Sequence, residues 1–194
     1  MKLRGLYAIT PEAPDLVERA RQALEGGIAL LQYRRKRRDL HEAREVVAVA
    51  RRHAVPVIIN DDFELALEVD AAGAHLGRDD GELAVARARL AGKILGASCY
   101  NDAALARKAV SLGADYVAFG AVFASPTKPG AVRAPLSLFS ETRLGVPLCA
   151  IGGITLDNAP QLIAAGADLL AVISDLFDAP DIAQRAAQYR KLFP

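Results

Sequence analysis

The sequence predicts a single-domain (β/α)8 TIM barrel, an α/β fold in which eight parallel strands alternate with helices. Three observations lead to this prediction. Short apolar runs recur along the whole chain, segments with helical spacing separate them, and 194 residues allow about 24 residues for each of eight units. That length is at the low end for this barrel and leaves no room for a second domain. We therefore expect one domain over residues 1–194.

Eight apolar runs supply the predicted strands. They are Leu6–Thr10, Ile28–Arg34, Pro56–Asn60, Gly73–Leu76, Ile94–Ser98, Tyr116–Gly120, Pro147–Ile151 and Leu169–Ile173. Repeated strand–helix units require a parallel sheet, because parallel neighbours need a crossover connection. A doubly wound open sheet is the alternative architecture, but the G-x-G-x-x-G fingerprint that would follow its first strand is absent.

Apolar residues recur with helical spacing between these runs. The clearest repeats are Ala43-Val47-Ala50-Ala54, Leu105-Ala109-Leu112 and Ile182-Ala186-Tyr189-Phe193. Several of the helical segments run into glycine, as at Gly26, Gly113 and Gly166, which is typical of helix ends.

Composition narrows the class of function. Apolar residues make up 52% of the chain, charged residues make up 24%, and the net charge of +1 gives no electrostatic reason to expect a nucleic acid partner. No apolar run approaches the roughly 20 residues that cross a membrane, and the N-terminus lacks the pattern of a signal peptide. We expect a cytoplasmic protein in which Cys99 and Cys149 are buried thiols.

In a barrel of this kind the chemistry lies at the C-terminal ends of the strands, and the second predicted strand ends in polar residues. Side chains alternate along a strand, so Gln32, Arg34 and Lys36 share one face, while Leu31 and Tyr33 face the outer helices. Two cations and an amide that point into the barrel mouth would form an anion site. We expect Arg37 and Arg38 instead to be loop residues exposed to solvent.

Carboxylates follow the third and fourth predicted strands. Asn60, Asp61 and Asp62 end the third, and Asp79 and Asp80 follow the fourth. Neighbouring strands bring these groups to one rim, where a hard divalent cation such as Mg²⁺ would neutralise them together with substrate phosphates. Capping of the next helix is the alternative role, most readily for Asp62 and Asp79.

Three later loops suit phosphate. The loop after the sixth strand carries the hydroxyl and amine groups of Ser125, Thr127 and Lys128. The seventh strand runs into Gly152-Gly153 and the eighth ends at Ile173-Ser174, each followed by a helical segment. Glycine lets backbone N–H groups approach a phosphate, and the loops after strands seven and eight are the usual phosphate site of this barrel.

The two halves of the mouth together predict a type of chemistry. One side suits a phosphate, and the other suits a diphosphate with a metal ion. No Ser-His-Asp pattern and no reactive cysteine is evident at the mouth. We therefore expect catalysis by positioning and by charge stabilisation of a leaving group.

These motifs resemble those of the thiamine phosphate synthase family along the whole chain. The matching stretches, in order, are Gly5–Thr10, Gln32–Lys36, Ile58–Asp61, Ala74–Asp80, Gly96–Ser98, Pro126–Lys128, Ala150–Ile154 and Ala171–Ser174. The resemblance implies an enzyme that joins a hydroxymethylpyrimidine diphosphate to a hydroxyethylthiazole phosphate, giving thiamine phosphate and diphosphate. It also implies a dissociative reaction, in which a pyrimidine cation forms before the thiazole nitrogen captures it.

The resemblance also implies roles for individual residues. Gln32, Arg34, Lys36, Asn60 and Lys128 would hold the diphosphate, Asp61 and Asp80 would coordinate Mg²⁺, and Ser98 would contact the pyrimidine amino group. Ser125, Thr127, Gly153, Ile173 and Ser174 would bind the thiazole phosphate. Arg34, Lys36, Ser98 and Lys128 would act in catalysis. The family is often dimeric, so a homodimer is a further expectation.

Three positions depart from the family pattern, and three other functions compete. Ser125 stands where threonine is common, Tyr100 where many relatives have histidine, and Arg78 where glutamine is common. The nearest competitor is a thiazole tautomerase of the same fold, which the resemblance associates with a histidine near Tyr100 and with no Pro-Thr-Lys lid. The others are a different phosphate-binding barrel enzyme and a non-catalytic sensor of thiamine precursors.

Overall fold

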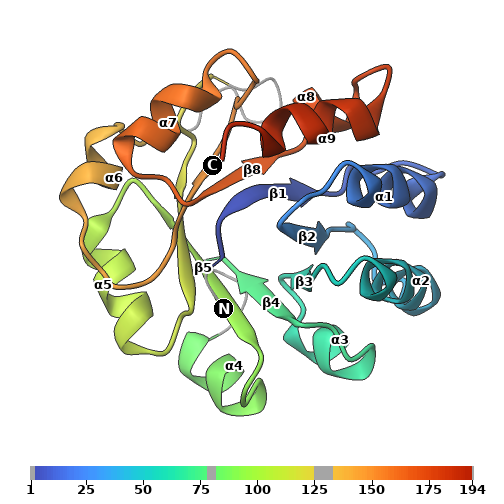
Figure 1. The fold of residues 1–194 in the computed structure, drawn as a ribbon. Coiled ribbons are helices and arrows are strands. Elements are labelled where there is room, and N and C mark those ends of the chain that lie inside the picture. Colours follow the sequence, from blue (N-terminus) through green and yellow to red (C-terminus); the bar gives the residue numbers. More distant parts are fainter. Residues whose placement is uncertain (1–2, 78–81, 125–132, 194) are drawn as a thin grey trace.

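The structure is a computed structural model that describes residues 3–77, 82–124 and 133–193, and it contains the predicted closed barrel (Figure 1). Eight parallel strands pair in sequence order, and the last pairs with the first. They are β1 (Gly5–Ile9), β2 (Leu30–Tyr33), β3 (Val57–Asn60), β4 (Gly73–Leu76), β5 (Ile94–Tyr100), β6 (Tyr116–Gly120), β7 (Leu148–Ile151) and β8 (Leu169–Val172). The predicted fold class is confirmed.

Helices form a ring outside the strands (Figure 1). They are α1 (Leu16–Glu25), α2 (Leu40–Arg52), α3 (Phe63–Glu68), α4 (Leu83–Arg89), α5 (Ala103–Ser111), α6 (Ser137–Glu141), α7 (Ala159–Ala165), α8 (Ser174–Phe177) and α9 (Ile182–Arg190). The short helix α8 directly follows β8, and α9 then completes the ring against α1 and β1. None of the helices in the described ranges is both long and apolar enough to cross a membrane.

Every predicted run overlaps a strand, with differences only at the ends. The third strand begins one residue later than predicted, and the fifth continues two residues further, to Tyr100. The helical repeat that began at Ala43 predicted continuation to Ala54, but α2 ends at Arg52 and Ala54 has a φ of 55°. Side-chain periodicity therefore located the elements, whereas turns decided their ends.

The buried residues divide between two cores. The larger core lies between the strands and the helices, and it includes Leu31 and Tyr33 of β2. The smaller fills the barrel interior and takes Leu30 from the same strand. This alternation along β2 is the one predicted from the sequence.

The barrel interior is narrow, and a glycine on β5 makes space for a tyrosine from β6. A Cβ atom at Gly96 would lie 2.1 Å from Cζ and 2.3 Å from the hydroxyl oxygen of Tyr116, so any larger residue would displace the ring. Tyr116 is fully buried and meets the ring of Tyr7 edge to face, with ring centroids 5.8 Å apart. Polar aromatic residues therefore occupy the centre of the barrel.

Candidate active site

The residues predicted to act in function divide between two arcs of the C-terminal rim. Strands β2, β3, β4 and β5 are consecutive in the barrel and carry the residues expected to hold the pyrimidine diphosphate. Strands β7 and β8 are neighbours on another arc and carry the expected thiazole phosphate site. Six residues to which the sequence analysis gave a role or a departure lie outside the described residues: Arg78, Asp79, Asp80, Ser125, Thr127 and Lys128.

Gln32 lies inside the barrel rather than at its open mouth. Its side chain is 3% exposed, and its amide nitrogen donates a hydrogen bond to the hydroxyl of Tyr7 at 2.6 Å. The alternation of β2 predicted the inward direction. It did not predict that the amide would already have a partner from β1.

The backbone beyond β2 is attached to the segment that follows β1. The N–H of Arg34 donates to the hydroxyl of buried Thr10 at 2.9 Å, and the N–H of Lys36 donates to the carboxylate of Glu12 at 2.7 Å. The Arg34 residue is half-buried, whereas Lys36 is exposed. The loop thus holds both residues at the rim and leaves the Lys36 amine in solvent.

Arg35, between them, has a structural role. Its guanidinium donates to both carboxylate oxygens of Glu42 on α2, to the carbonyl of Ala13 and to Glu12. These contacts join the loops after β1 and β2 to the outer helix layer. Arg38 likewise pairs with Glu68 at 2.6 Å, although it also lines the groove between the loops after β2 and β3.

A groove at the rim brings three predicted residues together. Lys36, Asn60 and Asp61 line a cavity of about 250 Å³ between the loops after β2 and β3. The amide nitrogen of Asn60 donates to the Asp61 carboxylate at 2.6 Å, and the Asp61 N–H donates to the carbonyl of His75 at 2.8 Å. Asp62, in contrast, caps α3 by accepting from the N–H of Leu65, so its predicted capping role is confirmed.

Asp61 also has an unusual backbone. Its φ of 63° lies in the left-handed region, which costs a non-glycine residue about 1–2 kcal/mol. Such strain is frequent where a side chain must be held in a functional direction. In the ranges the structure describes, no group of three or more His, Cys, Asp or Glu residues could hold a metal ion by itself.

Ser98 ends a hydrogen-bonded chain that crosses the barrel interior. Its hydroxyl lies 2.8 Å from Nε2 of His75, whose Nδ1 lies 2.9 Å from the hydroxyl of Tyr116. The Tyr116 hydroxyl lies 2.8 Å from that of Tyr7, which accepts from Gln32. Two predicted site residues are therefore connected through three residues to which the sequence prediction gave no role.

Strand alternation carried a signal for these three residues. Tyr7 alternates with Leu6 and Ala8, and the latter two belong to the outer core. The same reasoning places His75 and Tyr116 inside the barrel. Applied to every strand, it would have shown a cluster of polar interior side chains, although not their pairing.

The loops after β7 and β8 have the backbone features expected of a phosphate site. Gly152 and Gly153 both have positive φ, at 105° and 63°, and a Cβ atom at Gly153 would lie 2.3 Å from the carbonyl oxygen of Ala124. The Asn158 side chain fixes this turn, donating to the Gly153 carbonyl and accepting from the Thr155 N–H, both at 2.9 Å. Ile173 is half-buried and Ser174, the first residue of α8, is exposed.

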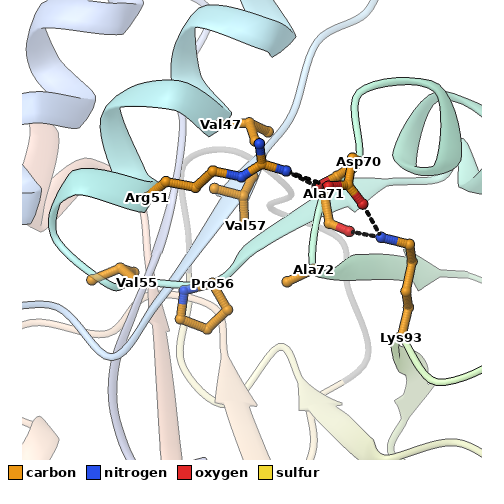
Figure 2. Close-up of a pocket in the computed structure, with 9 residues that line it drawn as sticks. All are labelled: Val47, Arg51, Val55, Pro56, Val57, Asp70, Ala71, Ala72 and Lys93. Carbon is orange, nitrogen blue, oxygen red and sulfur yellow. Dashed lines mark hydrogen bonds and ion pairs between the residues drawn. The ribbon is translucent and has the colours of Figure 1, made fainter.

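A second cavity, of about 260 Å³, lies at the opposite end of the barrel, where β3 and β5 begin. Figure 2 shows Asp70 between Arg51 and Lys93 at its edge. The carboxylate of Asp70 pairs with the Arg51 guanidinium at 2.5 Å and with the Lys93 amine at 2.8 Å. Each of these charges has an opposite partner, so the cluster is a structural ion network away from the C-terminal rim.

The two cysteines are unsuited to nucleophilic catalysis. Both are buried and free, and burial raises the pKa of the Cys99 thiol to about 12. Burial also raises the pKa of Cys149. The thiols therefore remain protonated at neutral pH, as expected for structural residues.

Comparisons with known proteins agree with the geometry. The family described as thiamine monophosphate synthase matches residues 6–176. The thiamine-phosphate synthase of Aromatoleum aromaticum is 60% identical over 99% of this chain and 97% of that protein. That of Methylobacillus flagellatus is 54% identical over 98% of this chain and 96% of that protein.

Solved structures divide into a close and a distant group. Thiamine phosphate pyrophosphorylase from Pyrococcus furiosus superposes with a TM-score of 0.87 at 33% identity, covering 98% of this chain and 96% of that one. A 3-hexulose-6-phosphate synthase superposes with a TM-score of 0.75 at 18% identity, covering 98% of this chain and all of that one. The second likeness concerns the fold alone.

The two glycines Gly153 and Gly145 make a matched test of the turn after β7. Both have positive φ, but a Cβ atom at Gly145 would meet no atom within 4 Å. We expect Gly145→Ala to lower the free energy of unfolding by about 1 kcal/mol, from backbone strain alone. We expect Gly153→Ala to lower it by about 3 kcal/mol, because the Ala124 carbonyl must also move. Denaturant titration measures both, and equal losses would contradict the close packing at Gly153.

Proposed function

The chain belongs to the thiamine monophosphate synthase family, and from this membership we propose how its barrel mouth performs the reaction. The enzyme is a transferase that condenses 4-amino-2-methyl-5-hydroxymethylpyrimidine diphosphate with 4-methyl-5-hydroxyethylthiazole phosphate. The products are thiamine phosphate and diphosphate. The observation that carries this function is 60% identity to a thiamine-phosphate synthase over 99% of the chain, on a barrel whose described rim has the expected polar residues.

The arc of β2 and β3 binds the diphosphate. Arg34 and Lys36 supply positive charge, and Asn60 supplies an amide donor next to them. Gln32, whose buried amide donates to Tyr7, supports this arc from inside the barrel. Lys128, from the loop after β6, completes this set. As the bond between the pyrimidine methylene carbon and the diphosphate oxygen breaks, negative charge grows on the leaving group, and these cations stabilise it more strongly in the transition state than in the bound substrate.

Asp61 and Asp80 would hold Mg²⁺. This ion favours oxygen ligands and typically takes one or two carboxylates together with phosphate oxygens. Asp61 fits that requirement, because its carboxylate lies on the groove that also contains Lys36. When bound, the ion would neutralise part of the charge of the leaving diphosphate.

The remaining residues position the two rings. Ser98 contacts the edge of the pyrimidine that carries the amino group. Ser125, Thr127, Gly153, Ile173 and Ser174 bind the phosphate of the thiazole. Of the described members, Ser98 lies on β5, whereas Gly153, Ile173 and Ser174 follow β7 and β8, so the thiazole nitrogen would approach the pyrimidine methylene carbon across the mouth.

The order of bond changes is dissociative. Diphosphate leaves first, the aminopyrimidine ring carries the resulting positive charge, and the thiazole nitrogen then donates its electron pair to the methylene carbon. The raised pKa values of Cys99 and Cys149 argue against a covalent intermediate on either thiol, because neither is available as a nucleophile. Those free, buried thiols also suit a reducing compartment, so we propose that the enzyme is cytoplasmic. We propose in addition, from its family, that it forms a homodimer.

A product assay tests the function directly. Purified protein with Mg²⁺ and both substrates should give thiamine phosphate, detected after oxidation to its fluorescent form. Chelation of the metal with EDTA should abolish the product, and added Mg²⁺ should restore it. Folded protein that forms no product from verified substrates would overturn the function. Isomerisation of the thiazole alone would then identify a tautomerase.

Adjacent aspartates test the metal assignment. Asp61→Ala should lower kcat at least about 100-fold, because the leaving diphosphate loses its metal, while the fold survives. Asp62→Ala is the matched control: it removes the neighbouring carboxylate and the cap of α3, which should cost about 1 kcal/mol of stability and little turnover. Steady-state kinetics against Mg²⁺ concentration and thermal unfolding distinguish the two. Full activity in Asp61→Ala would refute the assignment.

Ser174 tests the division of the mouth into two halves. Removal of its hydroxyl in Ser174→Ala should raise KM for the thiazole phosphate about tenfold, the value of one hydrogen bond to a charged group. KM for the pyrimidine diphosphate should change less than about twofold. Initial rates with each substrate varied at saturating levels of the other give both constants. A similar increase in both would mean that the two sites are assigned wrongly.

A further inference from the structure

The hydrogen-bonded chain inside the barrel joins residues from five strands. In order, its members are Gln32, Tyr7, Tyr116, His75 and Ser98, from β2, β1, β6, β4 and β5. All four links are between 2.6 and 2.9 Å. The first four members are buried, and Ser98 is half-buried at the end near the rim. The chain therefore crosses the buried interior and ends at Ser98, its most exposed member.

The first link of this chain has a fixed direction, because the Gln32 amide nitrogen donates to the Tyr7 oxygen. In a relay that continues away from Gln32, the Tyr7 hydroxyl gives its own proton to Tyr116, and the Tyr116 hydroxyl gives its proton to Nδ1 of His75. A neutral imidazole that accepts at Nδ1 carries its proton on Nε2, which faces the Ser98 oxygen.

Packing keeps the chain in this form. The tyrosine rings meet edge to face, and the His75 ring lies 5.5 Å from that of Tyr116, so none of the three can turn without displacing another. Burial raises the pKa of both tyrosines, so each keeps its proton at neutral pH. Gly96 supplies the space for Tyr116, since any side chain there would overlap its hydroxyl.

We propose that Tyr7, Tyr116 and His75 are positioning residues that hold His75 as the Nε2–H tautomer and so direct the Ser98 hydroxyl toward the pyrimidine. The inference rests on the proposed role of Ser98. One lone pair of the Ser98 oxygen accepts from His75, so its proton and its other lone pair remain for the substrate. A 4-aminopyrimidine presents an amino donor beside a ring-nitrogen acceptor, and a hydroxyl fixed in this way complements that edge.

The tautomer can be measured without any substrate. All three histidines are among the described residues, and only His75 is buried, so long-range ¹H–¹⁵N correlation spectra of ¹⁵N-histidine protein separate its signals from those of His41 and His53. A His75→Asn variant assigns them by their loss. At pH 7.5 we expect the Nε2–H tautomer in the resting enzyme. An Nδ1–H tautomer or an imidazolium would overturn the proposal.

Tyr116→Phe interrupts the chain while it keeps the ring that fills the space over Gly96. We expect the His75 signals to move toward those of the exposed histidines, because Nδ1 has lost its donor. KM for the pyrimidine diphosphate should rise about tenfold, and KM for the thiazole phosphate should stay within about twofold. Unchanged His75 signals, or equal increases in both constants, would show that Tyr116 does not act through His75. If the variant fails to fold, the tautomer of the unmodified enzyme still decides.

A double-mutant cycle separates positioning from general loss of structure. In a Ser98→Ala background, Tyr116→Phe should have almost no further effect on kcat/KM, because the hydroxyl that the chain directs is gone. Additive losses would contradict the proposal.

Tyr189→Phe is the matched control, since it removes a buried phenol hydroxyl from the helix layer, where it donates to Asp175. That variant should lose stability, show no pyrimidine-specific change in KM and keep the His75 spectrum. A protein that makes no thiamine phosphate but has the expected His75 tautomer would refute the proposed function. It would leave the hydrogen-bonded arrangement of Tyr7, Tyr116 and His75 intact.

Discussion

Closure of the parallel sheet is the constraint on which the rest of the molecule depends. β1 pairs with β8 along four residues, and the N–H of Gly5, the first residue of β1, donates at 2.9 Å to the carbonyl of Asp168, which directly precedes β8. Asp168 also accepts from the N–H of Leu148 through its side chain, which links the beginnings of β7 and β8. Once the ring is closed, all eight C-terminal strand ends share one rim, and the arc of β2–β5 faces the same mouth as the arc of β7 and β8. This arrangement lets the two sites proposed above open into one mouth.

Closure also determines what the interior can contain. Eight short strands enclose a space that side chains must fill completely, and here part of the filling is polar. A buried hydroxyl or imidazole without a partner costs about 1–3 kcal/mol, so a polar interior is stable only when each group bonds to the next. Among the described residues, no buried side-chain nitrogen or oxygen lacks a partner. The same requirement that stabilises the core thus joins the groups from Gln32 to Ser98 in one continuous hydrogen-bonded chain.

The sequence predicted the strands, their order and the face of β2 that points inward, because each of these depends on local periodicity. It also predicted that Lys36, Asn60 and Asp61 would gather at the rim, since neighbouring strand ends meet there. It could not predict the link between Tyr7 and Tyr116, which are 109 residues apart and meet only through the register of the closed sheet. For the same reason it placed Gln32 in the open mouth, whereas the structure buries its amide against Tyr7. The assigned roles of the substrate-binding and metal-binding residues remain predictions.

The loop after β2 shows how such a site can bind a highly charged ligand at low entropic cost. Ordering a flexible loop costs about 1–2 kcal/mol for each residue fixed. Here the backbone at Arg34 and Lys36 is already bonded to Thr10 and Glu12, and Arg35 joins the same segment to α2. A diphosphate bound as proposed would order little of this loop beyond the exposed Lys36 side chain. Electrostatic attraction is therefore available to stabilise the departing charge rather than to organise the loop, which is the condition under which fixed cations accelerate loss of a leaving group.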